Sequence, residues 1–453
     1  MALSLGLGII NVVTENGDFY TYGYNTGGQL GIGSCEDQLV PVLLGKQAVF
    51  GGRGVVMISA GTQRTACVTI DGGCWTWGTV SNSAYSSTPT AQDLFMMRPS
   101  RLGPSNFGNS PVLMVACGSY FTALLTTAGH VWNYGRGLRG ELGHGDFLDK
   151  NTFTQIDPLR FGADHTVRIT MIAAGDEHTL AIGNTGEFLF SWGNTDFGSC
   201  ALGRGDAHNA GIPGQIPPHT HNGMRVSFIA AGNDTSAVIT ADGVLWSCGR
   251  NGFGQLGHGT LGATNFLRRV GGDEWFGTGG ARTAALGYAN MLVLTQSKQV
   301  WICGNNSGML PVLVPSATST SGIEEFQNAN ITAIDCKIHK LALVTEGGSL
   351  YTFGTAVFGR FGFADLERSS ALENSIPRLV PNTLLGMARV GQWHRRHQDM
   401  ALAFAMGSHA RLGVDTPYIH GDYQDLISLM FGDMRIQPSP AAGEALRTLL
   451  GFD

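Results

Sequence analysis

The chain has 453 residues, of which 66 are glycine and only 14% are charged, and its formal net charge is −6. These values exclude a highly charged disordered chain, a protein that coats nucleic acid through overall positive charge and, because the glycines follow no three-residue period, a collagen-like fibre. Eight cysteines without a Cys-x-x-Cys pair fit neither a disulfide scaffold nor a zinc module, and residues 1–13 lack the basic start of a signal peptide. We therefore expect an intracellular protein, cytoplasmic or nuclear, with no membrane span and no direct nucleic-acid binding.

A short strand pattern that ends in glycine recurs along the chain. It occurs seven times, with successive glycines 50 to 58 residues apart, close to the longest periods of known repeat architectures. An apolar strand and a short turn such as Asp71-Gly72 or Asp242-Gly243 precede it, which predicts antiparallel hairpins. The copies are Tyr20–Gly23, Trp75–Gly78, Trp132–Gly135, Phe190–Gly193, Trp246–Gly249, Trp301–Gly304 and Tyr351–Gly354.

A glycine-rich loop follows this strand and is clearest at Gly28–Gly33, Gly140–Gly145 and Gly254–Gly259. Its leucine is expected to plug the space between neighbouring repeats, and its glycines to allow tight turns. One four-stranded sheet cannot bury both of its faces, and closing the repeats into a ring leaves few exposed sheet edges. We therefore predict an all-β, seven-bladed β-propeller of about four-stranded antiparallel blades.

The end of the repeat region suggests how the ring closes. Residues 387–391 and 400–404 repeat the first half of the unit without a following aromatic-glycine strand, and the first copy lacks that half. We predict that strands from the two ends of the chain share one blade, with residues 387–404 beside residues 9–23. The propeller domain is then 1–407, followed by a tail at 408–453.

The repeated motif, Ala-Gly-x-x-His-Thr followed by an aromatic strand, Trp-Gly and Gly-Gln-Leu-Gly-x-Gly, resembles the regulator of chromosome condensation repeat. Residues 230–259 match it closely, and the resemblance extends over about residues 9–406. It implies a seven-bladed propeller. Because the family includes the exchange factor for the small GTPase Ran, which also binds nucleosomes, a plant ultraviolet-B receptor, and regulators of trafficking and cilia, it implies no single activity.

Neither special activity transfers residue by residue. A photoreceptor requires tryptophans clustered in the Gly-x-x-His-Thr loops, and of five such loops only Gly391–Arg395 contains one. The nucleotide-displacing wedge of the exchange factor matches no segment here, and the common motifs of nucleotide, ester and zinc-dependent peptide hydrolysis are missing from the sequence. We predict no catalytic residue and no cofactor.

Two groups of residues are candidate partner-binding sites. One is the densest basic and aromatic cluster, suited to an acidic segment or a phosphate, although a solvated loop is the alternative. The other is the apolar side of two helices expected in the tail, which makes the tail amphipathic. The pairs His219-x-His221 and His394-x-x-His397 lack the further ligands that zinc requires, so we predict no metal. The binding candidates are Trp393, His394, Arg395, Arg396 and His397 in the cluster, and Leu426, Ile427, Met430, Leu446, Leu449 and Leu450 in the tail.

The most economical prediction is a non-enzymatic interaction scaffold that binds protein partners through the propeller faces and the tail, within a larger assembly. Two alternatives stay open: a guanine-nucleotide exchange factor for a small GTPase, and a chromatin-binding propeller that contacts histones.

Overall fold

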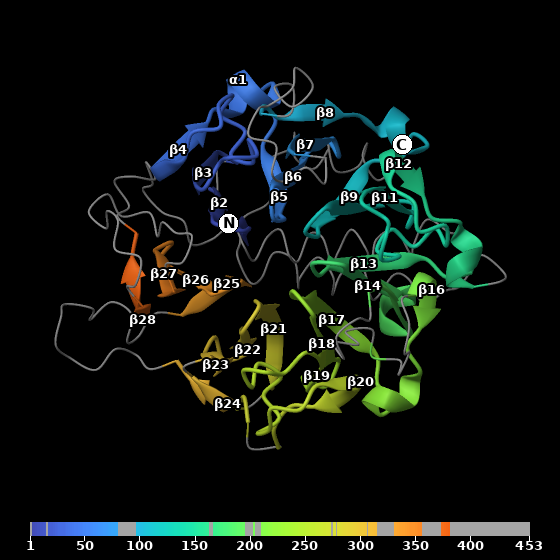
Figure 1. The fold of residues 1–453 in the computed structure, drawn as a ribbon, viewed down its shortest axis with the longest axis vertical. Helices are drawn as coiled ribbons and strands as arrows, with labels where there is room; N and C mark the ends of the chain where they lie inside the picture. Colours follow the sequence, from blue (N-terminus) through green and yellow to red (C-terminus); the bar gives the residue numbers. More distant parts are fainter. Residues whose placement is uncertain are drawn as a thin grey trace, which may run out of the picture. The chain divides into compact units, whose positions relative to one another are not determined.

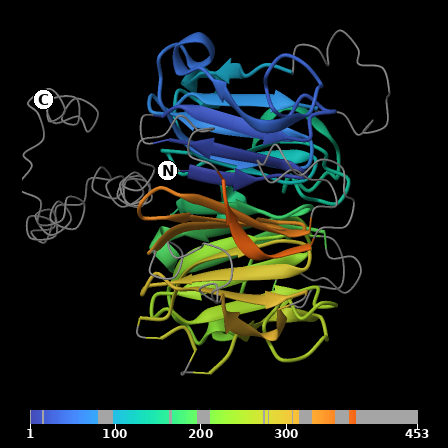
Figure 2. The same ribbon diagram turned by 90° about the vertical axis from the view of Figure 1, so that its left-hand side faces the viewer.

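The fold comes from a computed structural model, which describes residues 2–14, 17–79, 97–162, 166–194, 203, 210–272, 275–277, 279–305, 307–314, 330–355 and 373–380. In this part of the chain, 28 strands form seven four-stranded antiparallel sheets. The sheets are arranged around a common centre (Figure 1), and their strands run from one face of the ring to the other (Figure 2). The predicted seven-bladed β-propeller is confirmed.

Each blade is continuous in sequence, and its strands follow chain order from the centre of the ring outward. Blades 1 to 4 consist of β1 (Ala2–Leu5), β2 (Ile9–Val13), β3 (Phe19–Gly23) and β4 (Gln38–Leu44); β5 (Val55–Ala60), β6 (Arg64–Thr69), β7 (Cys74–Gly78) and β8 (Ser100–Leu102); β9 (Val112–Cys117), β10 (Phe121–Thr126), β11 (Val131–Gly135) and β12 (Lys150–Gln155); and β13 (Ile169–Ala174), β14 (His178–Gly183), β15 (Phe188–Gly193) and β16 (Ala210–Gln215).

Blades 5 to 7 follow the same plan. They consist of β17 (Val226–Ala231), β18 (Thr235–Thr240), β19 (Leu245–Gly249) and β20 (Thr264–Arg269); β21 (Ala281–Leu286), β22 (Asn290–Thr295), β23 (Val300–Gly304) and β24 (Gly308–Leu313); and β25 (Ile331–Lys337), β26 (Lys340–Thr345), β27 (Leu350–Thr355) and β28 (Glu373–Leu379). The described helices are short: α1 (Lys46–Phe50) and the 3₁₀ helices Pro104–Phe107, Pro158–Phe161, Asn184–Gly186 and Pro218–His221. None is long and apolar enough to cross a membrane.

The seven predicted aromatic-glycine strands are the third strands of the blades. Their final glycine is required by geometry: Gly23 has a φ of 117°, and a Cβ there would lie 2.0 Å from the carbonyl oxygen of Gly8. The predicted plugs are also confirmed, because Leu30, Leu142 and Leu256 are buried, two of them in apolar clusters that join neighbouring blades. These clusters form the core, which is distributed around the ring.

The predicted closure by a shared blade is wrong. Residues 2–5 form β1, which turns at Gly8 (φ 75°) and pairs with β2, so the first blade takes all four strands from residues 2–44. The sequence did not lead us to predict this turn within residues 1–13. The ring closes instead where β1 meets β25: the backbone N–H of Leu5 donates to Asp335 Oδ2 at 2.6 Å, and one apolar cluster joins the two blades.

Four features of the sequence analysis lie outside the described residues: strands at 387–404, the basic cluster at 393–397, the tail at 408–453 and its predicted helices.

Candidate functional site

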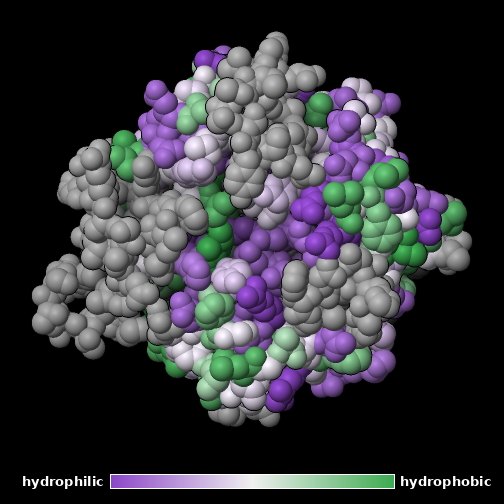
Figure 3. Space-filling model, viewed as in Figure 1, coloured by the Kyte–Doolittle hydropathy of each residue, from purple (hydrophilic) through white to green (hydrophobic). Residues whose placement is uncertain are grey.

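Seven loops that join the first and second strands of the blades gather around the centre of the ring. Because successive strands alternate in direction, all seven emerge on the same face, which we call the axial face. Figure 3 shows hydrophilic residues at the centre of the ring. We call these connections the axial loops; they are residues 6–8, 61–63, 118–120, 175–177, 232–234, 287–289 and 337–339, the last of which includes Lys337, the final residue of β25.

Six of the seven axial loops begin with glycine, and the seventh begins with Lys337. The glycines allow neighbouring blades to approach closely: a Cβ at Gly61 would lie 2.1 Å from the carbonyl oxygen of Gly118, and a Cβ at Gly175 would lie 2.4 Å from that of Gly232. The ring of small residues is therefore interrupted once, by a long cationic side chain.

Lys337 forms an ion pair across the centre of the ring. Its Nζ lies 2.7 Å from Oδ1 of Asp176, which belongs to blade 4, three blades away from blade 7. The side-chain amide of Asn233 donates to the other oxygen of Asp176. Lys337 is followed by Ile338, whose φ of 56° is strained for a β-branched residue. The ion pair therefore links the axial loops of blades 4 and 7.

Arginines surround this central pair, and each lies over a tyrosine of another loop or strand. The guanidinium of Arg136 is 3.1 Å from Glu177 and 5.8 Å from the ring centre of Tyr120. The guanidinium of Arg64 lies 5.1 Å from the ring centre of Tyr134. The contact of Arg64 joins blade 2 to blade 3, that of Arg136 with Tyr120 lies within blade 3, and the ion pair of Arg136 with Glu177 joins blade 3 to blade 4.

The third arginine, Arg250, is the most exposed. Its guanidinium is 3.6 Å from Asp234 and 4.7 Å from the ring centre of Tyr288, and 39% of its side chain is exposed. Burial raises the pKa of Asp234 above its ordinary value, and the nearby charge of Asp176 adds to this effect. The axial face thus carries closely spaced charges of both signs, held in position by blades 4 to 7.

One histidine of the axial motif is structural. His178 is buried, its Nε2 lies 2.9 Å from Ser236 Oγ in the next blade, and burial lowers the pKa of its ring to about 4. The imidazole is therefore neutral near pH 7 and serves as a hydrogen-bonding link between blades 4 and 5.

None of the partner-binding residues predicted from sequence falls within the described part of the chain. Of the histidine pairs, His219 and His221 lie on a 3₁₀ helix at the opposite face, and His221 is buried. Within the described residues, no group of three His, Cys, Asp or Glu side chains is placed to hold a metal ion. Asp176 and Lys337 were not among the predicted site residues, although a lysine at the position of a repeated glycine is a visible signal in the sequence.

Comparison with known proteins agrees with the fold. The RCC1-like domain family matches residues 18–396. The E3 ubiquitin-protein ligase HERC2 of Mus musculus is 30% identical over 302 residues, which are 65% of this chain and 6% of that protein. The ultraviolet-B receptor UVR8 of Arabidopsis thaliana is 29% identical over 277 residues, 58% of this chain and 59% of the receptor. The chain thus spans less than two thirds of either relative.

Two solved structures share the architecture. Human WBSCR16 superposes with a TM-score of 0.65 at 20% identity, covering 80% of this chain and 94% of that one. Prp20p from Saccharomyces cerevisiae, described together with its binding to Gsp1p and histones, superposes with a TM-score of 0.64 at 18% identity, covering 80% and 86%. These similarities concern the fold alone. With the repeat, the seven blades and a family match over most of its length, the chain belongs to the RCC1-like domain family.

Proposed function

We propose that this protein is a non-enzymatic interaction scaffold that binds protein partners through the axial face. The observation that supports this most directly is the set of ion pairs and arginine–tyrosine contacts around Lys337 and Asp176, the most exposed of which involve Arg250. Arginine and tyrosine are enriched at the energetic centres of protein interfaces, and rigid blades place them without an ordering penalty. Charged side chains of a partner can replace one member of these ion pairs and bind the other.

The C-terminal residues extend this proposal. The basic cluster 393–397 suits an acidic segment of a partner, and the apolar residues of the tail at 408–453 suit a hydrophobic groove. We propose that the tail, separate from a propeller domain at 1–407, is a second docking element.

Matched charge reversals test the axial face. Arg250 on the axial face and Arg225 on the opposite face both form exposed ion pairs, at 3.6 Å with Asp234 and at 3.0 Å with Glu187. Affinity capture from native extract with quantitative mass spectrometry is expected to lose specific partners with Arg250→Glu and to retain them with Arg225→Glu. Equal capture by both variants and the unmodified protein would contradict an axial binding face.

Two narrower functions are tested separately. The likeness to Prp20p, which binds Gsp1p and histones, favours a guanine-nucleotide exchange factor or a chromatin-binding propeller as the alternatives. Release of labelled nucleotide from small GTPases tests the first, and binding to reconstituted nucleosomes tests the second. Acceleration of release by the chain would replace the scaffold proposal with exchange activity.

A further inference from the structure

A cavity opens on the face opposite the axial loops, within blade 5. It has a volume of about 200 Å³ and lies between the hairpin of β18 and β19 and the segment that joins β20 to β21. Among the described residues, its lining includes the charged Asp242 and Arg269 and the aromatic Trp275 and Phe276. Small-molecule sites usually exceed ~300 Å³, so this cavity has the size for one large side chain.

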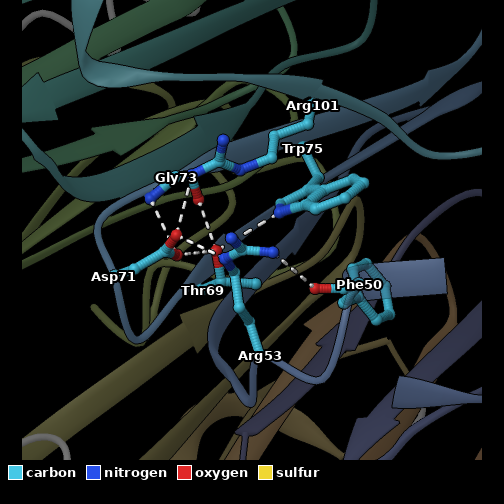
Figure 4. Close-up of polar contacts among 7 residues, drawn as sticks. All are labelled: Phe50, Arg53, Thr69, Asp71, Gly73, Trp75 and Arg101. Atoms are coloured by element: carbon cyan, nitrogen blue, oxygen red, sulfur yellow. Dashed lines mark hydrogen bonds and ion pairs between the residues drawn. The ribbon is translucent and has the colours of Figure 1, made fainter. Parts of the chain in front are cut away.

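Blade 2 shows how the same hairpin is completed when its partners are part of the chain (Figure 4). The hydroxyl of Thr69 donates to Asp71 Oδ1 at 2.6 Å, which shapes the turn. The other oxygen, Oδ2, accepts from Arg53 Nε at 2.6 Å and from Arg101 Nη2 at 2.7 Å. One carboxylate therefore orders the hairpin with one oxygen and binds two guanidinium groups with the other.

The hairpin of blade 5 repeats the first half of this arrangement. The hydroxyl of Thr240 donates to Asp242 Oδ1 at 2.6 Å, as Thr69 does to Asp71. Partial burial alone would raise the pKa of Asp71, yet hydrogen bonds from Thr69, Gly73 and Arg101 hold that pKa below its ordinary value. Within the described part of the chain, Asp242 has no ion pair, and its Oδ2 accepts no hydrogen bond.

Strand register shows which residues of blade 5 occupy the positions of the two arginines of blade 2. Arg101 pairs with Trp75 and Arg269 with Trp246, so Arg269 occupies the position of Arg101. However, it lies beyond ion-pair distance from Asp242. Val55 pairs with Thr69 in blade 2, and Val226 pairs with Thr240 in blade 5. Arg53 lies two residues before Val55, and the equivalent residue of blade 5, two residues before Val226, is Met224. In the part of blade 5 that the structure describes, the carboxylate of the blade 2 arrangement is therefore present without the guanidinium groups that bind it.

We propose that this cavity binds an arginine side chain of a partner protein. The guanidinium donates to Oδ2 of Asp242 and stacks on the indole of Trp275. The incoming arginine supplies a guanidinium partner for this carboxylate, as Arg53 and Arg101 do for Asp71 in blade 2. A planar guanidinium suits this site better than an ammonium because it donates in several directions and stacks on aromatic rings. This docking site lies on the face opposite the one proposed above.

A partner-independent probe tests the proposal. Ligand-observed NMR titration of the full chain measures the affinity for N-acetyl-arginine amide and for N-acetyl-citrulline amide, its neutral isostere. We expect the arginine derivative to bind and the citrulline derivative to bind at least about tenfold more weakly, as for loss of a charged hydrogen bond. Equal affinities would overturn the proposal. Because no partner protein is used, this result is independent of the test of the axial face.

Three variants locate the site. Asp242→Asn is expected to weaken binding of the arginine probe about tenfold. Asp71→Asn, the matched change where the carboxylate already has its arginines, is expected to leave binding unchanged. Met224→Arg places an arginine where blade 2 has Arg53, and it is expected to compete with the probe and to raise the melting temperature. A folded Met224→Arg or Asp242→Asn variant that binds the probe as the unmodified protein does would contradict the assignment.

Discussion

Glu141 occupies a position of the glycine-rich loop at which two other repeats have glutamine. The equivalent residues Gln29 and Gln255 accept a backbone N–H through their side-chain oxygen, at 2.8 and 3.0 Å, and Glu141 does the same with Arg139 at 2.6 Å. The amide of Gln255 also donates to a backbone carbonyl of the next blade, at 3.2 Å. A carboxylate cannot donate this bond, and the second oxygen of Glu141 lies 3.9 Å from Arg136 Nε instead.

We predict that Glu141 makes stability depend on pH. Burial raises the pKa of this carboxyl to about 7, although backbone hydrogen bonds and Arg136 oppose the rise. A carboxyl with a raised pKa in the folded state binds its proton more tightly there, so its stabilising effect is complete below about pH 4.5 and is lost as the pH rises through 7.

The variant Glu141→Gln removes this titration and retains the hydrogen bond of the turn. Arg136 keeps its partner Glu177. We expect equal stability at pH 5 and a variant more stable by ~2 kcal/mol at pH 8, measured by urea unfolding. Parallel stability curves for the two proteins between pH 5 and 8 would show that Glu141 does not titrate in this range.

Neighbouring inner strands are linked by the same side-chain contact around part of the ring. Ser4 Oγ accepts the backbone N–H of Ala60, and Ser59 Oγ accepts that of Cys117, each at 2.9 Å. At the seam between β25 and β1, Asp335 replaces the serine and accepts the N–H of Leu5. Burial raises the pKa of Asp335 to about 6, despite hydrogen bonds that favour its charged form. The hydrogen bond at the seam therefore uses a carboxylate acceptor, Asp335, whose charged form is destabilised by burial.

A pair of substitutions at Asp335 separates its hydrogen bond from its charge. Asp335→Ala leaves the N–H of Leu5 without its acceptor, and we expect a loss of ~1 kcal/mol in the free energy of unfolding. Asp335→Ser restores the hydroxyl that other blades use, and we expect it to match or exceed the unmodified protein at pH 7.5. If both variants unfold at the same urea concentration, the contact with Leu5 does not stabilise the seam.

The elements with a strong local signature were predictable, and those without one were not. Third strands carry an aromatic residue and a glycine that geometry demands, so the sequence predicts all seven. The strand β1 is four residues long and has only a glycine turn after it, which is why the shared-blade closure was predicted instead. A short apolar segment has no periodicity that distinguishes it from its neighbour.

At the scale of the ring, sequence predicts how many blades there are but not which side chains meet across it. Lys337 and Asp176 are separated by 161 residues, and their contact depends on blades 4 and 7 facing each other over the centre. The open carboxylate of Asp242 becomes visible only when two blades are superposed by strand register. Repeats therefore reveal architecture, and departures between repeats reveal candidate sites.

The completeness of the ring leads to a prediction for the C-terminal tail. Among the described residues, seven complete four-stranded sheets are formed by residues 2–379, and blade 1 takes its four strands from residues 2–44. Truncation after residue 407 is therefore expected to leave the melting temperature nearly unchanged. The six apolar tail residues would each gain ~1.5–3 kcal/mol on full burial, so their removal should abolish binding to a partner or self-association. Thermal unfolding and light scattering measure the two effects, and an unfolded truncated chain would instead make the tail part of the propeller core.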